Sequence, residues 1–232
     1  MMANSCLNLN LGTNSYKNAM EIQYKIHKLI SCKKLPNVLL TMEHPHTITI
    51  GKTGSNQDLK ASTKTISDSG VKIVKTNRGG KATYHGPGQL ITYPIINLRD
   101  LRLGPQKYIF KIEETIINTL KDFEVDANRS VGKPGVWVGN SKIAAVGVKI
   151  SEGISSHGFS INLNTNLSYF NFIIPCGISD KSVCSLYSLG IKSIDSNYFR
   201  EILLKNFSNV FNLSIQTCSP KSIEHMYNIN II

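Results

Sequence analysis

Three stretches of the chain repeat apolar residues every three to four positions, which is the spacing of one face of an α-helix. The first runs from Tyr16 to Ile30, and Pro36 lies just beyond it. The second begins at Pro105, a residue suited to the first turn of a helix, and its apolar stripe continues to Leu120. The third covers Asn197 to Phe211. Helices are therefore expected at the start, centre and end of the chain.

The segments between these helices are rich in β-branched residues and predict short strands. The expected strands cover Val38 to Met42, Thr47 to Ile50, Val71 to Val74, Leu90 to Ile96 and Phe159 to Leu163. Pro94 places the fourth of them at a sheet edge or a bulge. A hairpin is expected from Val136 to Ile150, with its turn at Gly139 and Asn140. The pattern indicates the α+β class, as a single domain over residues 1–232 with a mixed or antiparallel sheet flanked by helices.

Composition narrows the class of protein. The chain has 232 residues, of which 41% are hydrophobic and 18% charged, and this is typical of a folded domain. The segment Met1 to Leu11 is polar and lacks the apolar run of a signal peptide, and no stretch is long enough to span a membrane. The five cysteines are widely spaced without a C-x-x-C pair, which argues against a disulfide framework or a structural zinc site. A cytoplasmic location is expected.

The chain is strongly basic. It carries 26 Lys and Arg against 15 Asp and Glu, for a formal net charge of +11. Such a charge favours an acidic partner, which could be nucleic acid, anionic lipid or an acidic protein. Most of the charge comes from lysine in a chain that is also rich in Ile and Asn, so a general compositional bias is an equal explanation.

A glycine-rich segment from Arg78 to Gln89 is the strongest local signal. It contains four glycines together with Arg78, Lys81 and His85, a composition that lets a backbone approach a ligand closely and favours an anionic or carbonyl-bearing one. It fits neither the phosphate-binding P-loop nor the dinucleotide-binding pattern. On composition alone, an irregular structural loop between two strands explains it equally well.

The longer string from Arg78 to Asn97, RGGKATYHGPGQLITYPIIN, closely resembles the signature of the LipB family of octanoyltransferases. Similar segments lie at Glu43 to Gly51, at Gly135 to Gly147, at His157 to Asn164 and at Ile174 to Gly177. The resemblance covers about residues 11–189. It implies the biotin/lipoate protein ligase fold.

The resemblance also implies a pair of catalytic residues, Cys176 and Lys142. Cys176 lies between Pro175 and Gly177, a frame that suits an exposed bend. A thiol needs a neighbouring base or cation to become a nucleophile at neutral pH, and Lys142 would supply it. Without the resemblance, Cys176 would be interpreted as a buried thiol and Lys142 as a solvated lysine.

The family resemblance further implies which residues bind the acyl chain. Those expected are Arg78, Gly79, Gly80, Lys81, Ala82, Thr83, Tyr84, His85, Ala145, Val146, Gly147, Gly158, Phe159 and Ser160. Tyr84 and His85 would lie near the reacting carbonyl. The role of His157 stays open. His44 and His46 flank Pro45 without further ligands nearby, so no metal is expected.

The implied reaction moves an octanoyl group from octanoyl-acyl carrier protein, through a thioester on Cys176, to a lysine of a lipoyl domain. Acceptors would be the E2 subunits of 2-oxoacid dehydrogenases and the glycine-cleavage H protein, with no cofactor. An ATP-dependent lipoate or biotin ligase and an amidotransferase acting between lipoyl domains are the nearest alternatives. A basic nucleic-acid-binding module is a further alternative, but no binding motif supports it. No membrane partner is expected.

Overall fold

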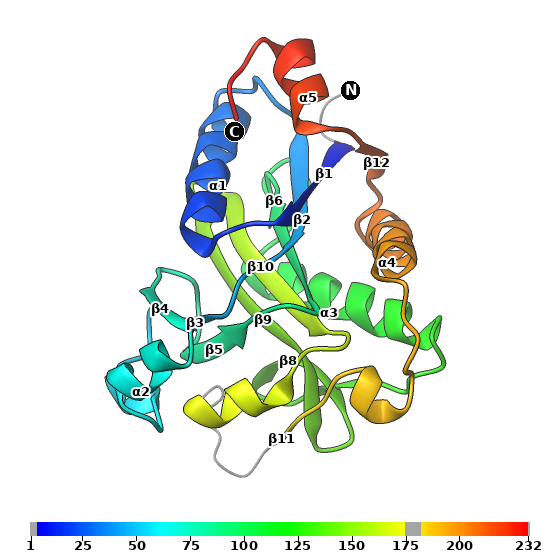
Figure 1. Cartoon of the computed structure of the whole chain (residues 1–232). Helices are drawn as coiled ribbons and strands as arrows, with labels where there is room; N and C mark the ends of the chain where they lie inside the picture. Colours follow the sequence, from blue (N-terminus) through cyan, green and yellow to red (C-terminus); the bar gives the residue numbers. More distant parts are fainter. Residues whose placement is uncertain (1–3, 175–181, 232) are drawn as a thin grey trace.

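A mixed β-sheet forms the centre of the molecule. The computed structural model describes residues 4–174 and 182–231. Within these ranges the large sheet comprises nine strands: β1 (Ser5–Thr13), β2 (Asn37–Glu43), β6 (Gln89–Ile95), β7 (Asn128–Ser130), β8 (Lys133–Val138), β9 (Ser141–Ser151), β10 (Ile154–Asn162), β11 (Ser182–Val183) and β12 (Ser214–Thr217). They follow the order β12-β1-β2-β6-β10-β9-β8-β7, and β11 pairs with β9 (Figure 1). Parallel pairs join β1 to β2 and β12, and β11 to β9. The expected α+β fold with a mixed sheet is confirmed.

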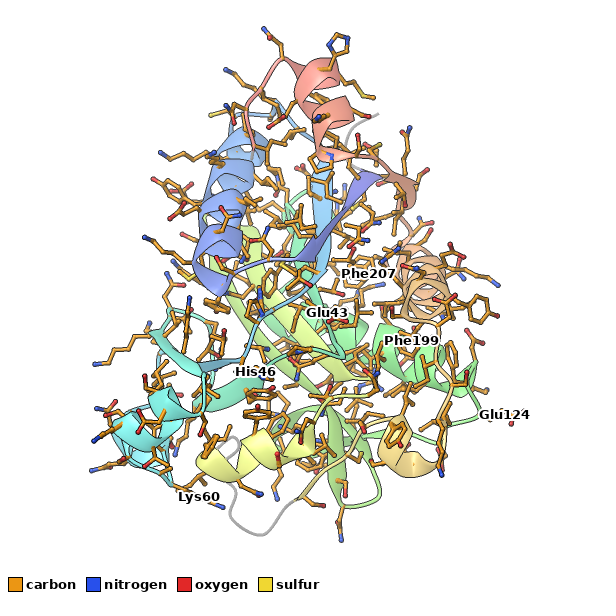
Figure 2. All side chains as sticks on the ribbon, viewed as in Figure 1. Glu43, His46, Lys60, Glu124, Phe199 and Phe207 are labelled. Carbon is orange, nitrogen blue, oxygen red and sulfur yellow. The ribbon has the colours of Figure 1, made fainter. Side chains whose placement is uncertain are left out.

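Helices cover both faces of this sheet. Helix α1 (Tyr16–Ser31) packs on β10 and β6, whereas α3 (Pro105–Lys121) and α4 (Ser196–Phe211) pack on each other on the opposite side (Figure 1). All three match the expected helices. Strand β2 shows the alternation that this arrangement requires, because Leu39 faces the core beneath α3 and α4 while Leu40 faces the core beneath α1. Phe199 and Phe207 of α4 fill the first of these cores (Figure 2).

A smaller sheet lies beside the large one. It contains β3 (Thr47–Ile50), β4 (Lys72–Lys75) and β5 (Ala82–His85) in the order β4-β3-β5. Its own hydrophobic core includes Ile48 and Tyr84 and is closed by the short helix α2 (Thr63–Asp68) and by the 3₁₀ segment η2 (Leu167–Phe172). Strand β5 corrects the expectation that the whole of residues 78–89 forms an irregular loop.

The structure adds one strand that was not predicted and corrects the expected place of another. The polar segment at the start of the chain forms β1, because the buried amide of Asn8 bonds Thr217 of β12 and accepts a hydrogen bond from Thr41 of β2. Strand β6 is central rather than an edge strand. Pro94 is tolerated there because regular pairing of β6 with β10 ends at Thr92, so its missing N–H costs the ladder no hydrogen bond at that point.

The C-terminal part of the described chain adds elements that were not predicted. After α4 come β12 at the edge of the large sheet and helix α5 (Pro220–Tyr227), which begins at the cap residue Ser219. Two short 3₁₀ segments, η1 (Asn56–Asp58) and η4 (Tyr187–Leu189), lie elsewhere in the described chain. In residues 4–174 and 182–231, no helix is long and apolar enough to cross a membrane.

Candidate active site

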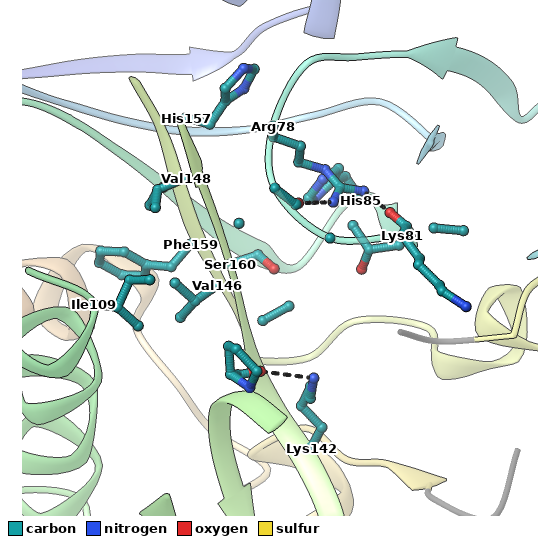
Figure 3. Close-up of a pocket in the computed structure, with 18 of the residues that line it drawn as sticks. Arg78, Lys81, His85, Ile109, Lys142, Val146, Val148, His157, Phe159 and Ser160 are labelled. Atoms are coloured by element: carbon teal, nitrogen blue, oxygen red, sulfur yellow. Dashed lines mark hydrogen bonds between the residues drawn. The ribbon is translucent and has the colours of Figure 1, made fainter. Parts of the chain in front are cut away.

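A pocket of about 590 Å³ lies where the two sheets meet. Its walls come from the segment 78–81 and β5 on one side and from the middle of β9 and β10 on the other, with contributions from α1, β6 and α3 (Figure 3). Small or apolar residues such as Ala82, Ala145, Gly147 and Phe159 form part of its lining. In Figure 3, His157 and Lys142 lie toward opposite ends of this lining.

Arg78 shapes the glycine-rich wall. Its buried guanidinium donates to the Thr49 carbonyl and hydroxyl, each at 2.8 Å, and to the carbonyls of Gly79 and Lys81 at 2.9 and 2.8 Å. The Gly79 N–H in turn donates to the Val148 carbonyl of β9 at 3.0 Å. One side chain therefore fixes the path of the loop and places a positive charge beside the pocket.

Glycine is required where the loop meets its neighbours. A Cβ on Gly51 would lie 2.3 Å from the Gly80 carbonyl oxygen, which is closer than backbone atoms tolerate. Gly80 itself has a φ of +85°, in the region that glycine occupies without strain. The backbone packs closely around this wall of the pocket, and this packing explains why the segment is rich in glycine.

One end of the pocket holds polar side chains next to the charged Arg78. His157 lies 2.8 Å from Asn77 Oδ1 through Nε2 and 3.4 Å from the Tyr16 hydroxyl through Nδ1. Burial, reinforced by the charges of Arg78 and Lys149, lowers the pKa of His157 to about 4. Burial lowers the pKa of His44 to about 4 as well. Both rings are therefore neutral at pH 7.

His85 belongs to the same end and is held by a chain of amides. Its Nδ1 donates to Gln89 Oε1 at 2.8 Å, and the Gln89 amide donates to Asn162 Oδ1 at 2.8 Å. Burial, followed by the nearby His44 and Arg78, lowers the pKa of His85 well below its usual value. The ring therefore remains neutral, and with Nδ1 as the donor it presents Nε2 as an acceptor.

Lys142 occupies the other end of the pocket. It lies near the start of β9, is 7% exposed, and donates through Nζ to the Pro134 carbonyl at 3.0 Å. Its Nζ also lies 4.7 Å from the centre of the Trp137 ring. Strand β11 pairs in parallel with β9, and its Val183 lies opposite Lys142. A buried amine held at a pocket wall is placed to exchange a proton with a reacting group.

The pocket brings together most of the residues expected to form a site. Lys142 lines it, and so do thirteen of the residues expected to bind the acyl chain: Arg78, Gly79, Gly80, Lys81, Ala82, Thr83, His85, Ala145, Val146, Gly147, Gly158, Phe159 and Ser160. Tyr84 is not among the lining residues, because it points to the other face of β5 and its hydroxyl bonds His46 at 2.7 Å. Cys176 lies outside the described residues.

Several lining residues were not expected at the site. Tyr16 comes from α1, Tyr93 from β6, Ile109 from α3, and Pro134 from the start of β8. Tyr93 lies within the family signature at residues 78–97, and Tyr16 and Ile109 lie in the apolar stripes of two expected helices. Neither signal separates pocket residues from core residues. Their place at the pocket follows from the packing of three separate elements.

The fold is shared with solved structures of known proteins. Lipoate-protein ligase A bound with ATP superposes with a TM-score of 0.75 at 15% identity, covering 99% of this chain and 96% of that one. A bi-partite lipoate protein ligase from Thermoplasma acidophilum gives 0.75 at 14% identity, over 98% and 93%. Biotin protein ligase from Aquifex aeolicus gives 0.52 at 14% identity, over 90% and 70%. The architecture is therefore that of the lipoate and biotin protein ligases.

Sequence relatives assign the family within that class. The family model of the lipoyl protein ligase A/B catalytic domain matches residues 15–208. The octanoyltransferase of Solibacter usitatus is 41% identical over 92% of this chain and 96% of its own length, and that of Alkaliphilus metalliredigens is 37% identical over 89% and 95%. The chain belongs to the lipoyl protein ligase A/B catalytic domain family, on its octanoyltransferase branch, and is a transferase enzyme.

Proposed function

We propose that the protein transfers an octanoyl group from octanoyl-acyl carrier protein to a lysine of a lipoyl domain, through a thioester on Cys176. The supporting observation is the pocket, whose small and apolar lining residues suit a linear acyl chain and whose one end holds the buried amine of Lys142. The acceptors are the lipoyl domains of 2-oxoacid dehydrogenase E2 subunits and the glycine-cleavage H protein.

The reaction has two half-reactions. In the first, Lys142 takes the proton of the Cys176 thiol, the sulfur attacks the thioester carbonyl of the donor, and the carrier thiol leaves with that proton. In the second, the lysine amine of the lipoyl domain attacks the octanoyl-Cys176 carbonyl, an amide forms, and the Cys176 thiol is released. No ATP is consumed because the donor thioester is already activated.

Described residues on both sides of Cys176 support this pairing. Ile174 donates its N–H at 2.8 Å to the carbonyl of Asp58, the last residue of η1. On the other side, Val183 lies opposite Lys142 in the sheet, and the Cys184 N–H donates to the Lys142 carbonyl at 3.0 Å. The chain that carries Cys176 thus returns to the strand that carries Lys142.

Intact mass spectrometry tests the proposal. Mixing the protein with octanoyl-acyl carrier protein should add one octanoyl group that hydroxylamine removes. Cys176→Ser should not form this labile adduct, and Lys142→Ala should form it at least about 100-fold more slowly. Cys218→Ser, which changes a half-buried thiol outside the pocket, is the matched control and should react like the native protein. Product formed only with ATP and free octanoate would instead indicate a ligase, the activity suggested by the shared fold.

A further inference from the structure

A turn beside the pocket ties Lys142 to helix α3. Lys142 Nζ donates to the Pro134 carbonyl, and the next residue, Gly135, donates its N–H to Glu113 Oε1 of α3 at 2.8 Å. We propose that Glu113 is a positioning residue, which holds the turn so that the Pro134 carbonyl fixes the Lys142 amine at the reacting centre. The inference rests on the proposed function, in which Lys142 moves the proton.

The packing between the turn and Lys142 leaves little freedom. Gly135 has a φ of +119°, and a Cβ there would come within 2.5 Å of the Ala144 carbonyl oxygen and 3.3 Å of Lys142 Cε. The stem of Lys142 therefore lies directly on the Gly135 backbone. The pairing of β8 with β9 also shifts register between Val136 and Trp137, next to Lys142. Such irregularities re-aim side chains at functional sites.

Glu113 is itself anchored. It is 7% exposed, and its second carboxylate oxygen lies 3.3 Å from Arg129 Nε of β7. Arg129 also bonds Glu114 at 2.5 Å and the Phe110 carbonyl at 3.0 Å, so its guanidinium is fixed on α3. A buried carboxylate needs both its charge and its lone pairs matched, and here Arg129 supplies the charge and Gly135 the hydrogen bond.

Single-turnover acylation by octanoyl-acyl carrier protein tests the role. Glu113→Ala should slow acylation by about 100-fold, with half-saturation by donor little changed, since a shift of about 1 Å at a reacting group has that effect. Glu113→Gln keeps an oxygen for the Gly135 N–H and should retain the rate to within about threefold. Glu114→Gln alters the same helix and the same arginine without contacting the turn, and should match the native protein.

A double-mutant cycle separates positioning from a general structural effect. If Glu113 acts through Lys142, Glu113→Ala should cause no further loss in a Lys142→Ala background. Equal losses from Glu113→Ala in both backgrounds, in variants whose melting temperatures show them folded, would overturn the inference and leave the proposed function intact. A native rate for Lys142→Ala would overturn both.

Discussion

Neutral histidines set how the stability of the molecule depends on pH. His44 and His157 have a pKa of about 4 in the folded protein, against an ordinary value of 6.5, because burial disfavours the charged ring. Between these values the unfolded chain binds more protons than the folded one. The stability that the neutral rings contribute is therefore present above about pH 6.5 and is lost as the pH falls toward 4.

The free energy of unfolding should accordingly fall between pH 7.5 and pH 5, by about 2 kcal/mol for each of these two histidines. Urea unfolding at both pH values measures it. His44→Gln, which keeps hydrogen-bonding groups but does not titrate, should be less stable at pH 7.5 yet show a smaller fall. The explanation fails if native protein and variant lose the same free energy.

Individual residues also show how much of the site could be predicted from the sequence. The motif predicted that His85 and Lys142 line one pocket, and the structure brings them to it. It also placed Tyr84 near the reacting carbonyl, whereas strand β5 turns that side chain away from the pocket and brings Thr83 and His85 into the lining. The direction of the Tyr84 side chain follows from the alternation of side chains along a strand. The glycine-rich composition of residues 78–89 predicted a loop there and not strand β5.

At the scale of elements, β6 and β10 pack closely against each other beside the pocket. A Cβ on Gly158 would lie 2.1 Å from the Thr92 carbonyl oxygen and 2.6 Å from Pro94 Cδ. The neighbouring His157 has a φ of +55°, which shows that β10 bends out of regular strand geometry here. Backbone and a proline ring cannot move aside cheaply, so the two strands require glycine at this position.

Gly158→Ala should therefore lower the free energy of unfolding by about 2 kcal/mol or more, as overpacking of rigid surroundings does. Gly104→Ala is the matched control, because nothing lies within 4 Å of the added Cβ and its φ of −77° suits any residue. That control should change stability by less than about 1 kcal/mol. Denaturant unfolding of both variants gives the comparison, and equal losses would contradict the close contact.

How well each element could be predicted depends on whether its contacts are near or far along the sequence. Helices α1 and α3 could be predicted because the apolar spacing is local and the caps are explicit, Ser15 for α1 and Pro105 in the first turn of α3. Strand β1 could not, because Asn8 looks like a loop residue until its bond to Thr217 is known. Partners more than two hundred positions apart leave no local pattern.

For the whole molecule, the charge of +11 bears on the proposed encounter with an acyl carrier protein. If the donor is acidic, attraction at a distance raises the rate of association, and dissolved salt screens it. A donor without a protein carrier, such as a small octanoyl thioester, lacks that long-range attraction.

Raising the salt from about 20 to 300 mM should therefore lower kcat/KM for octanoyl-acyl carrier protein by about tenfold or more. The same change should leave kcat/KM for a small octanoyl thioester within about twofold. Steady-state rates with the two donors give the answer. Equal salt responses would show that the charge reflects composition rather than steering.

The parallel pairing of β1 with β12 has a consequence for biosynthesis. Residues 5–8 pair with residues 214–217. The edge of β1 that faces β12 therefore stays unpaired until residues 214–217 have been synthesised. Until then β1 is an open strand edge, which can pair with other chains. A growing chain on the ribosome would carry this exposed edge through most of its translation, so completing the domain also removes a route to aggregation.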